Sequence, residues 1–169
     1  MPKLKVSVRK QGNKLQKNLQ ELLKLHKQKV EVGHFQEQGI HSGSGLSYVA
    51  LMKKHHTGYE FDGKTVPSRM ILDAFRFKLG SGFKNTIKEH FLKWGKMPNT
   101  QGSRAIMLEG IGKDMVKVEK SVFGIPSQFV PMNAGMTARL KGGNTPMVDS
   151  GELMEAVSYK TSITNTVVT

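Results

Sequence analysis

The sequence has no cysteine among its 169 residues, which excludes both a disulfide framework and a thiolate metal site. Nowhere do about 18 apolar residues follow one another, so no membrane-spanning helix is predicted, and we expect a soluble protein without a membrane partner. The first residues, Met1–Val6, lack the apolar stretch of a secretory signal. An apolar fraction of 37% is lean for a compact monomer, so we expect neighbouring subunits to complete part of the core.

Acidic residues are also scarce, with 13 Asp and Glu against 26 Lys and Arg, a formal charge of +13. The excess is concentrated at one end, because residues 1–30 contain nine Lys or Arg and the single acid Glu21. Residues 140–169 contain two Lys and three acids. Such a balance favours polyanionic neighbours, either nucleic acid or acidic protein surfaces, although a solvated basic helix explains the N-terminal charge equally well.

The hydrophobic pattern of the first third predicts alternating short strands and helices. Lys5–Arg9 alternates like a first strand, and Gln11–Gln28 has helical spacing with His26 within its apolar stripe, where we expect it buried. Lys29–Phe35 is typical of a second strand, and the glycine-rich stretch Gln36–Gly45 is predicted to be a mobile loop.

Turn and capping signals organise the next stretch. Ser47–His56 is expected to form a helix with Ser47 as its N-cap, ending at Gly58. Asp62-Gly63 lies between β-prone residues and predicts a hairpin turn.

The remaining helices follow from apolar spacing. Ser68–Leu79 and a helix beginning near Phe83 and ending at Trp94 are predicted to be separated by a turn at Gly80–Gly82. Another helix is expected over Arg104–Val122, although Gly110 and Gly112 weaken its start.

The C-terminal segment is predicted to form a short helix followed by a strand region. Asp149 and Glu152 have the spacing of a capping box, which predicts a short helix over Gly151–Ala156. Val157–Thr169 is rich in Thr and Val and predicts a terminal strand region. The expected fold is a single α+β domain over residues 1–169: a mostly antiparallel sheet packed with several helices, a long N-terminal amphipathic helix and an extended loop after the second strand.

Candidate chemistry is sparse. The adjacent pair His55-His56 cannot share one ion on a helix, because successive side chains point about 100° apart. Neither a nucleophile motif nor a pair of carboxylates stands out, so we expect no enzyme, no metal and no cofactor. Gly80-Ser-Gly82 lacks the Lys-Ser/Thr of a phosphate-binding loop, and an interhelix turn is the simpler interpretation.

Three stretches of the chain together resemble one family. The first has Val30–Gly33, the glycine-rich loop and a helix ending at His56-Thr-Gly58; the second is a hairpin followed by Val66-Pro-Ser-Arg69. The third reads Pro146-Met-Val-Asp149-Ser150-Gly151-Glu-Leu153, followed by Val157-Ser-Tyr159. This arrangement resembles the head–tail connector, neck and tail-completion proteins of tailed phages. Late in their chains, the proteins of that family commonly show "Pro-Leu-x-Asp-Thr-Gly-x-Leu" followed by "Ser-Ile-x-Tyr". His56-Thr-Gly58 replaces the family's Glu-Phe-Gly, and Arg69-Met-Ile its Arg-Pro-Phe, so connector, completion protein and tail terminator stay open.

The resemblance implies a structural virion protein, made in the host bacterial cytoplasm, that forms a ring of six or twelve copies at the phage neck. It would join tail to capsid around the DNA channel, contacting head-completion or portal-side proteins and tail-tube proteins. The motif residues expected to matter are Pro67, Arg69, Pro146, Asp149, Ser150, Gly151 and Leu153.

Two surfaces are expected to mediate these contacts. The glycine-rich loop and the terminal strand would cross between copies through Gln36, Gly39, Ile40, His41, Gly43, Val157, Tyr159 and Ile163. The basic face of the first helix would meet packaged double-stranded DNA or an acidic partner through Lys10, Lys14, Lys17 and Lys24. The alternative is a small basic, non-sequence-specific DNA-binding protein with no role in a particle.

Overall fold

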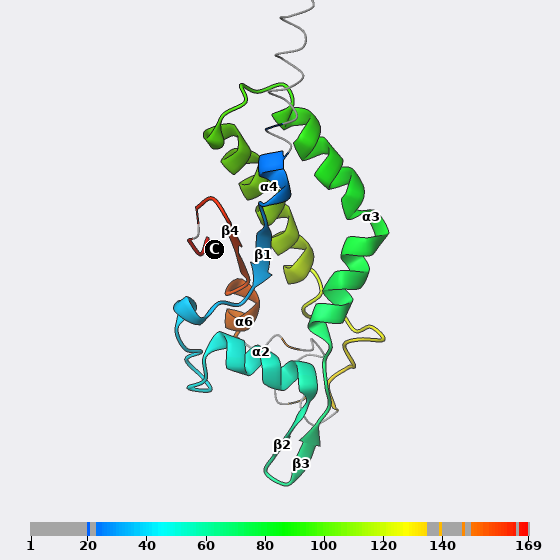
Figure 1. Cartoon of the computed structure of the whole chain (residues 1–169). Helices are drawn as coiled ribbons and strands as arrows, with labels where there is room; N and C mark the ends of the chain where they lie inside the picture. The colour runs from blue at the N-terminus through cyan, green and yellow to red at the C-terminus, as the bar shows by residue number, and fades with distance from the viewer. Residues whose placement is uncertain are drawn as a thin grey trace, which may run out of the picture.

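The computed structural model describes residues 20, 23–134, 139, 147, 150–164 and 166–168. Within them the chain is α+β, as the sequence predicts, but its strands form two separate two-stranded antiparallel sheets (Figure 1). The elements in chain order are β1 Val30–Gly33, the short 3-10 helix η1 Gln36–Gln38, α2 Tyr48–Thr57, β2 Tyr59–Phe61, β3 Lys64–Val66, α3 Ile71–Trp94, α4 Gln101–Lys120, α6 Glu152–Glu155 and β4 Ser158–Thr161.

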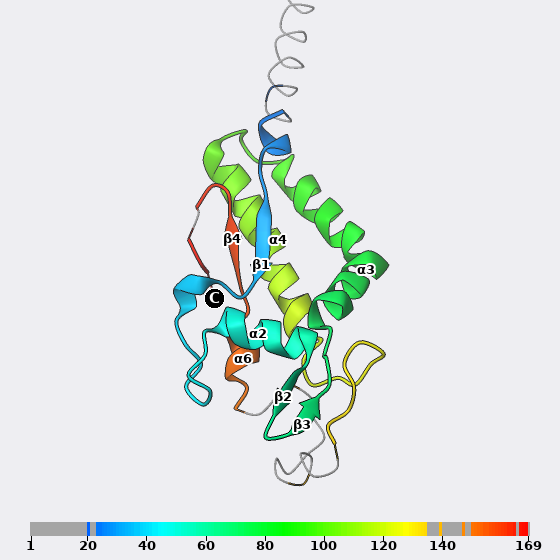
Figure 2. The ribbon, with the colours of Figure 1, turned by 60° about the horizontal axis from the view of Figure 1, so that its bottom comes forward.

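The first sheet joins the two ends of the described chain. Strand β1 pairs antiparallel with β4, so that Val32 lies opposite Tyr159 and Val30 opposite Thr161. On the other side of β4, Tyr159 exchanges two backbone hydrogen bonds with Val168, of 3.0 and 2.9 Å. Figure 2 shows this pair lying across α4. The predicted second strand and terminal strand region are therefore confirmed, and they pair with each other.

Local signals position α2 and the hairpin that follows it. The Ser47 hydroxyl accepts a 3.2 Å hydrogen bond from the Ala50 backbone N–H, as a helix N-cap does. Strands β2 and β3 are joined by Asp62 and Gly63, whose φ angles of 51° and 67° fit a two-residue hairpin turn. Both predictions are confirmed.

Helix α3 contradicts the predicted turn at Gly80–Gly82. It is one helix of 24 residues, and helical hydrogen bonding continues through both glycines. Apolar residues recur before and after the glycines, and packing against α4 keeps the segment helical despite the low helix propensity of glycine. The helix starts at Ile71 and not at Ser68.

Helix α4 begins at a capping box formed by Thr100 and Ser103. Its two glycines mark close approaches. A Cβ atom on Gly110 would lie 2.6 Å from the His90 ring of α3, and one on Gly112 would lie 2.3 Å from the Tyr159 ring of β4. These glycines, which the sequence suggests only as weak points in the helix, let α3 and β4 pack closely against α4.

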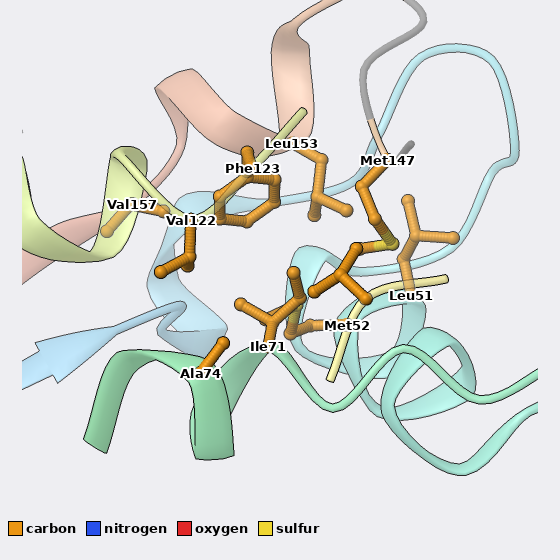
Figure 3. Close-up of a cluster of buried hydrophobic side chains, with 10 residues drawn as sticks. Leu51, Met52, Ile71, Ala74, Val122, Phe123, Met147, Leu153 and Val157 are labelled. Carbon is orange, nitrogen blue, oxygen red and sulfur yellow. The ribbon is translucent and has the colours of Figure 1, made fainter. Parts of the chain in front are cut away.

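The buried apolar side chains form two clusters. The larger gathers Leu51 and Met52 of α2, Ile71 of α3, and Leu153 and Val157 near the chain end around Val122 and Phe123 (Figure 3). The smaller lies between α3 and α4 and contains Phe83, Met107, Leu108 and Ile111. The larger cluster holds together the segments that line the candidate site.

The predicted N-terminal helix Gln11–Gln28 lies mostly outside the described residues, as does the predicted strand Lys5–Arg9. Among the described residues, Gln20 and Leu23–His26 are helical. The prediction that His26 is buried is wrong: its side chain is exposed, and Leu25 packs against the smaller core cluster instead. The apolar stripe of this turn is therefore rotated relative to the predicted one.

The short helix predicted over Gly151–Ala156 is present as α6, but its start differs from the prediction. Its N-cap is Gly151, in the left-handed conformation with φ 82°, and Asp149 lies outside the described residues. The Glu152 side chain does not act as the third residue of a capping box. Its carboxylate instead accepts hydrogen bonds from Ser42 of the glycine-rich loop.

Candidate functional site

A cavity of about 340 Å³ lies where the three family-like stretches meet. Its walls come from segments far apart in sequence: the glycine-rich loop, α2, the β2–β3 hairpin, the residues before α3, and the start of α6. The lining residues are His41, Ser44, Leu51, His55, Tyr59, Val66, Arg69, Asn133, Met147, Ser150, Gly151 and Leu153. We call this space the motif cavity.

Arg69 is the most unusual side chain in the motif cavity. Its residue is only 7% exposed, and one terminal nitrogen donates a 3.1 Å hydrogen bond to the Asn133 amide oxygen. Its Nε has no hydrogen-bond partner, and no carboxylate of the described residues pairs with it. Burial lowers the pKa of this guanidinium below its usual range. An anionic group, such as a carboxylate, is the chemical complement of this wall.

The backbone around Arg69 explains its position. The proline Pro67 disfavours helical geometry in the residue before it, so the chain stays extended between β3 and α3. The Arg69 N–H then donates to the His55 carbonyl at 2.7 Å, and the Met70 N–H to the Phe129 carbonyl at 2.8 Å. These bonds fix the arginine between α2 and the segment after α4.

Glu152 organises the glycine-rich loop beside the cavity. Its carboxylate accepts hydrogen bonds from the Ser42 N–H at 3.0 Å, the Ser42 hydroxyl at 2.6 Å and the Tyr48 hydroxyl at 2.6 Å. The His41 Nε2 lies 3.8 Å away. The Ser42 hydroxyl, followed by the Tyr48 hydroxyl, lowers the pKa of Glu152 to about 2. The sequence predicts a different role for this residue, and nothing in its spacing indicates this one.

The rest of the loop folds back on its own chain. The His41 N–H donates to the Leu46 carbonyl at 2.8 Å, and Gln38 donates from its side-chain amide to the Ala156 carbonyl. His34, just before the loop, lies 2.8 Å from the Leu153 carbonyl through its Nε2. The loop thus contains the short helix η1 and specific hydrogen bonds, where the sequence predicts an extended stretch. Its mobility stays a prediction.

Glu152→Gln is expected to loosen residues 39–45 without unfolding the chain, because a neutral amide accepts these hydrogen bonds more weakly than a carboxylate. Hydrogen exchange followed by mass spectrometry should show faster exchange at the Ser42 amide. The folded-state pKa is depressed, so the stabilising contribution of Glu152 is present above its ordinary value of 4.5 and is lost as the pH falls toward about 2.

Glu155→Gln is the matched control for Glu152→Gln. Glu155 lies on the same short helix, is mostly exposed and pairs with Lys120 at 2.6 Å, away from the loop. If both variants change loop exchange equally, the Glu152 contacts do not organise the loop.

The predicted contact residues divide into two groups. In the loop, Gln36, Gly39, Gly43 and Ile40 are exposed and His41 is half-buried, so this segment offers surface to a partner. In the terminal strand region, Val157 and Tyr159 are 0% and 3% exposed within the core of their own chain. Ile163 packs against the smaller core cluster. Strand β4 pairs with β1 of the same chain, and the Val157 and Tyr159 side chains are buried there. A contact of this strand region with a partner stays a prediction.

The predicted motif residues are partly brought together. Arg69, Ser150, Gly151 and Leu153 line the motif cavity. Pro67 is exposed at the approach to α3. Pro146 and Asp149 lie outside the described residues.

Most of the predicted basic face lies outside the described residues. Lys10, Lys14 and Lys17 lie outside the described residues, and Lys24 is exposed.

Comparisons with known proteins leave the family open. No family model matches the chain, and no curated protein or solved structure matches it. Across the described ranges, no three His, Cys, Asp or Glu side chains gather as a metal site would need. None of the helices in these ranges is both long and apolar enough to cross a membrane.

Proposed function

We propose that this chain is a structural subunit of a tailed-phage particle that forms a ring at the head–tail junction. In this role it completes the neck or tail and joins tail to capsid around the DNA channel. The observation that carries the proposal is the convergence of the family-like stretches. One cavity is lined by residues that lie far apart in sequence: His41 and Ser44, Arg69, and Ser150, Gly151 and Leu153.

The exposed apolar surface of α3 supports a role in assembly. Leu72, Phe77, Ile87, Phe91 and Leu92 are each at least 36% exposed, with Phe77 at 63%. Beyond its first turns, which join the larger core cluster, α3 packs mainly against α4 among the described elements, so part of this 24-residue helix is left for neighbours (Figure 1). Apolar side chains gathered on one exposed element are typical of surfaces that bind protein. An exposed apolar helix also agrees with the expectation, drawn from the apolar fraction of 37%, that neighbouring subunits complete part of the core.

The charge of the chain fits a position near packaged DNA. We expect the N-terminal lysines Lys10, Lys14, Lys17 and Lys24 to face the DNA channel or an acidic neighbour, since neutralising phosphate requires Lys or Arg but no particular sequence.

The experiment that tests the proposal is electron microscopy of lysates from a phage whose copy of this gene is interrupted. Separate filled heads and finished tails, or tails of uncontrolled length, are expected. Normal virions would contradict the particle role. A salt-sensitive affinity of the isolated chain for duplex DNA would then favour the DNA-binding alternative.

A further inference from the structure

A second cavity, of about 320 Å³, lies on the other side of α2 from the motif cavity and is not explained by the family-like stretches. Its walls include Val32 and Gly33 of β1, Met52, Lys53 and His56 of α2, and Glu119 of α4. The lining is mostly apolar apart from these charged or titratable groups. We call it the Glu119 cavity.

Glu119 is out of place in an apolar wall. The residue is 0% exposed, and neither carboxylate oxygen has a hydrogen-bond partner. The nearby basic side chains do not pair with it: Lys53 is exposed, and the His56 Nε2 lies 3.9 Å from the Asp73 carboxylate. A buried carboxylate is costly unless a cation or several donors meet it. The missing complement is therefore a group with positive charge and N–H donors.

The cavity adjoins the open edge of a sheet. The Tyr159 N–H donates to the Val168 carbonyl, and the Tyr159 carbonyl accepts from the Val168 N–H. Tyr159 therefore forms no backbone hydrogen bond with Val32, which lies opposite it on β1, and the N–H and C=O of Val32 point away from β4. Because the direction of the backbone groups alternates along a strand, the N–H and C=O of Val30 also point away from β4. Within the described ranges no hydrogen bond reaches the backbone groups of Val30 or Val32, and Figure 2 shows no described strand on that side of β1. Such an edge is a template for one more strand.

We propose that an extended segment from a second copy of this chain pairs with the free edge of β1 and inserts a Lys or Arg side chain into the Glu119 cavity. Alternate side chains of a strand added there would point to the same face as Val32, which itself lines the cavity. The ammonium or guanidinium group would pair with the Glu119 carboxylate. This inference rests on the proposed ring of identical subunits and assigns one of its contacts.

The sequence offers a segment with the required pattern. Lys5–Arg9 reads Lys-Val-Ser-Val-Arg, so its basic residues and its valines fall on opposite faces of an extended strand. It belongs to the 19 N-terminal residues outside the described part, ahead of the helical turn at residues 23–26 that leads into β1. A contact between one copy's N-terminal segment and another copy's β1 is head-to-tail, as a closed ring requires.

Analytical ultracentrifugation of the full chain over a concentration series tests the proposal. Glu119→Gln is expected to weaken self-association about tenfold or more, because a buried pair loses its charge. At a concentration where both chains are monomeric, its thermal midpoint should be no lower than that of the parent, so misfolding would not account for the loss. The double variant Lys5→Gln/Arg9→Gln should weaken association similarly, and adding Glu119→Gln to it should produce little further loss.

Two controls separate this contact from general effects. Glu31→Gln changes an exposed carboxylate on the same strand and should leave association unchanged. Val30→Pro removes an outward N–H at the first residue of an edge strand, where proline is tolerated, and should abolish association, whereas Val30→Ala should not. Unchanged association in Glu119→Gln, or a parent chain that stays monomeric at every concentration, would overturn the inference. Neither result would decide the particle role, which the lysates test separately.

Discussion

In the monomeric chain, at protein concentrations below those of self-association, Glu119→Gln is expected to raise the free energy of unfolding by about 3 kcal/mol near pH 8 and to leave it almost unchanged near pH 3. Burial raises the pKa of Glu119 to about 7 from its ordinary value of 4.5. One unit of pKa corresponds to about 1.4 kcal/mol, so this difference amounts to about 3 kcal/mol. Glutamine resembles the protonated acid in size and charge, which is why the two forms should agree at low pH.

The sign of this effect follows from proton binding. The folded chain holds the Glu119 proton more tightly than the unfolded chain does, because burial penalises the charged form. The stabilising contribution is therefore fully present below pH 4.5 and is lost as the pH rises through about 7.

Urea denaturation of the parent and the variant at several pH values measures the difference. Glu31→Gln, on an exposed side chain, should not reproduce it. If the monomeric variant is less stable than the monomeric parent at pH 8, Glu119 is paired within its own chain when ionised, which would contradict its lack of a hydrogen-bond partner there.

Gly112→Ala is expected to lower the free energy of unfolding by about 1–2 kcal/mol. The new Cβ would lie 2.3 Å from Cδ2 of Tyr159, a distance that real Cβ atoms essentially never show. Tyr159 is 3% exposed and held on both sides by β1 and Val168, so its ring has little freedom to move. Overpacking of this kind costs about 1–3 kcal/mol, offset in part by the higher helix propensity of alanine.

Gly80→Ala is the matched control for this change. Gly80 is also an interior helical glycine, but it is exposed and a Cβ there would meet nothing within 4 Å. We expect this variant to gain about 0.5–1 kcal/mol, since only the propensity difference acts. Chemical denaturation of both variants gives the comparison, and stabilisation by both would contradict the close contact between α4 and β4.

The sequence predicted the elements that depend on local chemistry. Ser47 as an N-cap, the turn at Asp62-Gly63 and the core-facing spacing of α4 each depend on a few neighbouring residues, and each is confirmed. The predicted turn at Gly80–Gly82 is wrong, because the helix continues through both glycines despite their low helix propensity. Packing against α4 keeps that segment helical, and such long-range packing cannot be inferred from the local pattern.

The candidate sites were predictable only in part. The motif residues Arg69, Ser150, Gly151 and Leu153 were identified in the sequence, but their meeting around one cavity depends on tertiary contacts. Asn133, which bonds to Arg69, carries no sequence signal. Glu119 carries one: it lies four residues after Met115 and three before Val122, within the apolar stripe of α4, where a charged residue is unexpected.

The central claim, that the chain completes the head–tail junction, is tested most directly by counting particles in lysates of the gene-interrupted phage. Negative-stain micrographs should show separate filled heads and finished tails, or tails of uncontrolled length, and a plasmid copy of the parent gene should restore joined virions. The Gly80→Ala gene is the control for expressing a substituted chain and should also restore them. Joined, infectious virions in the absence of any plasmid copy would contradict the account.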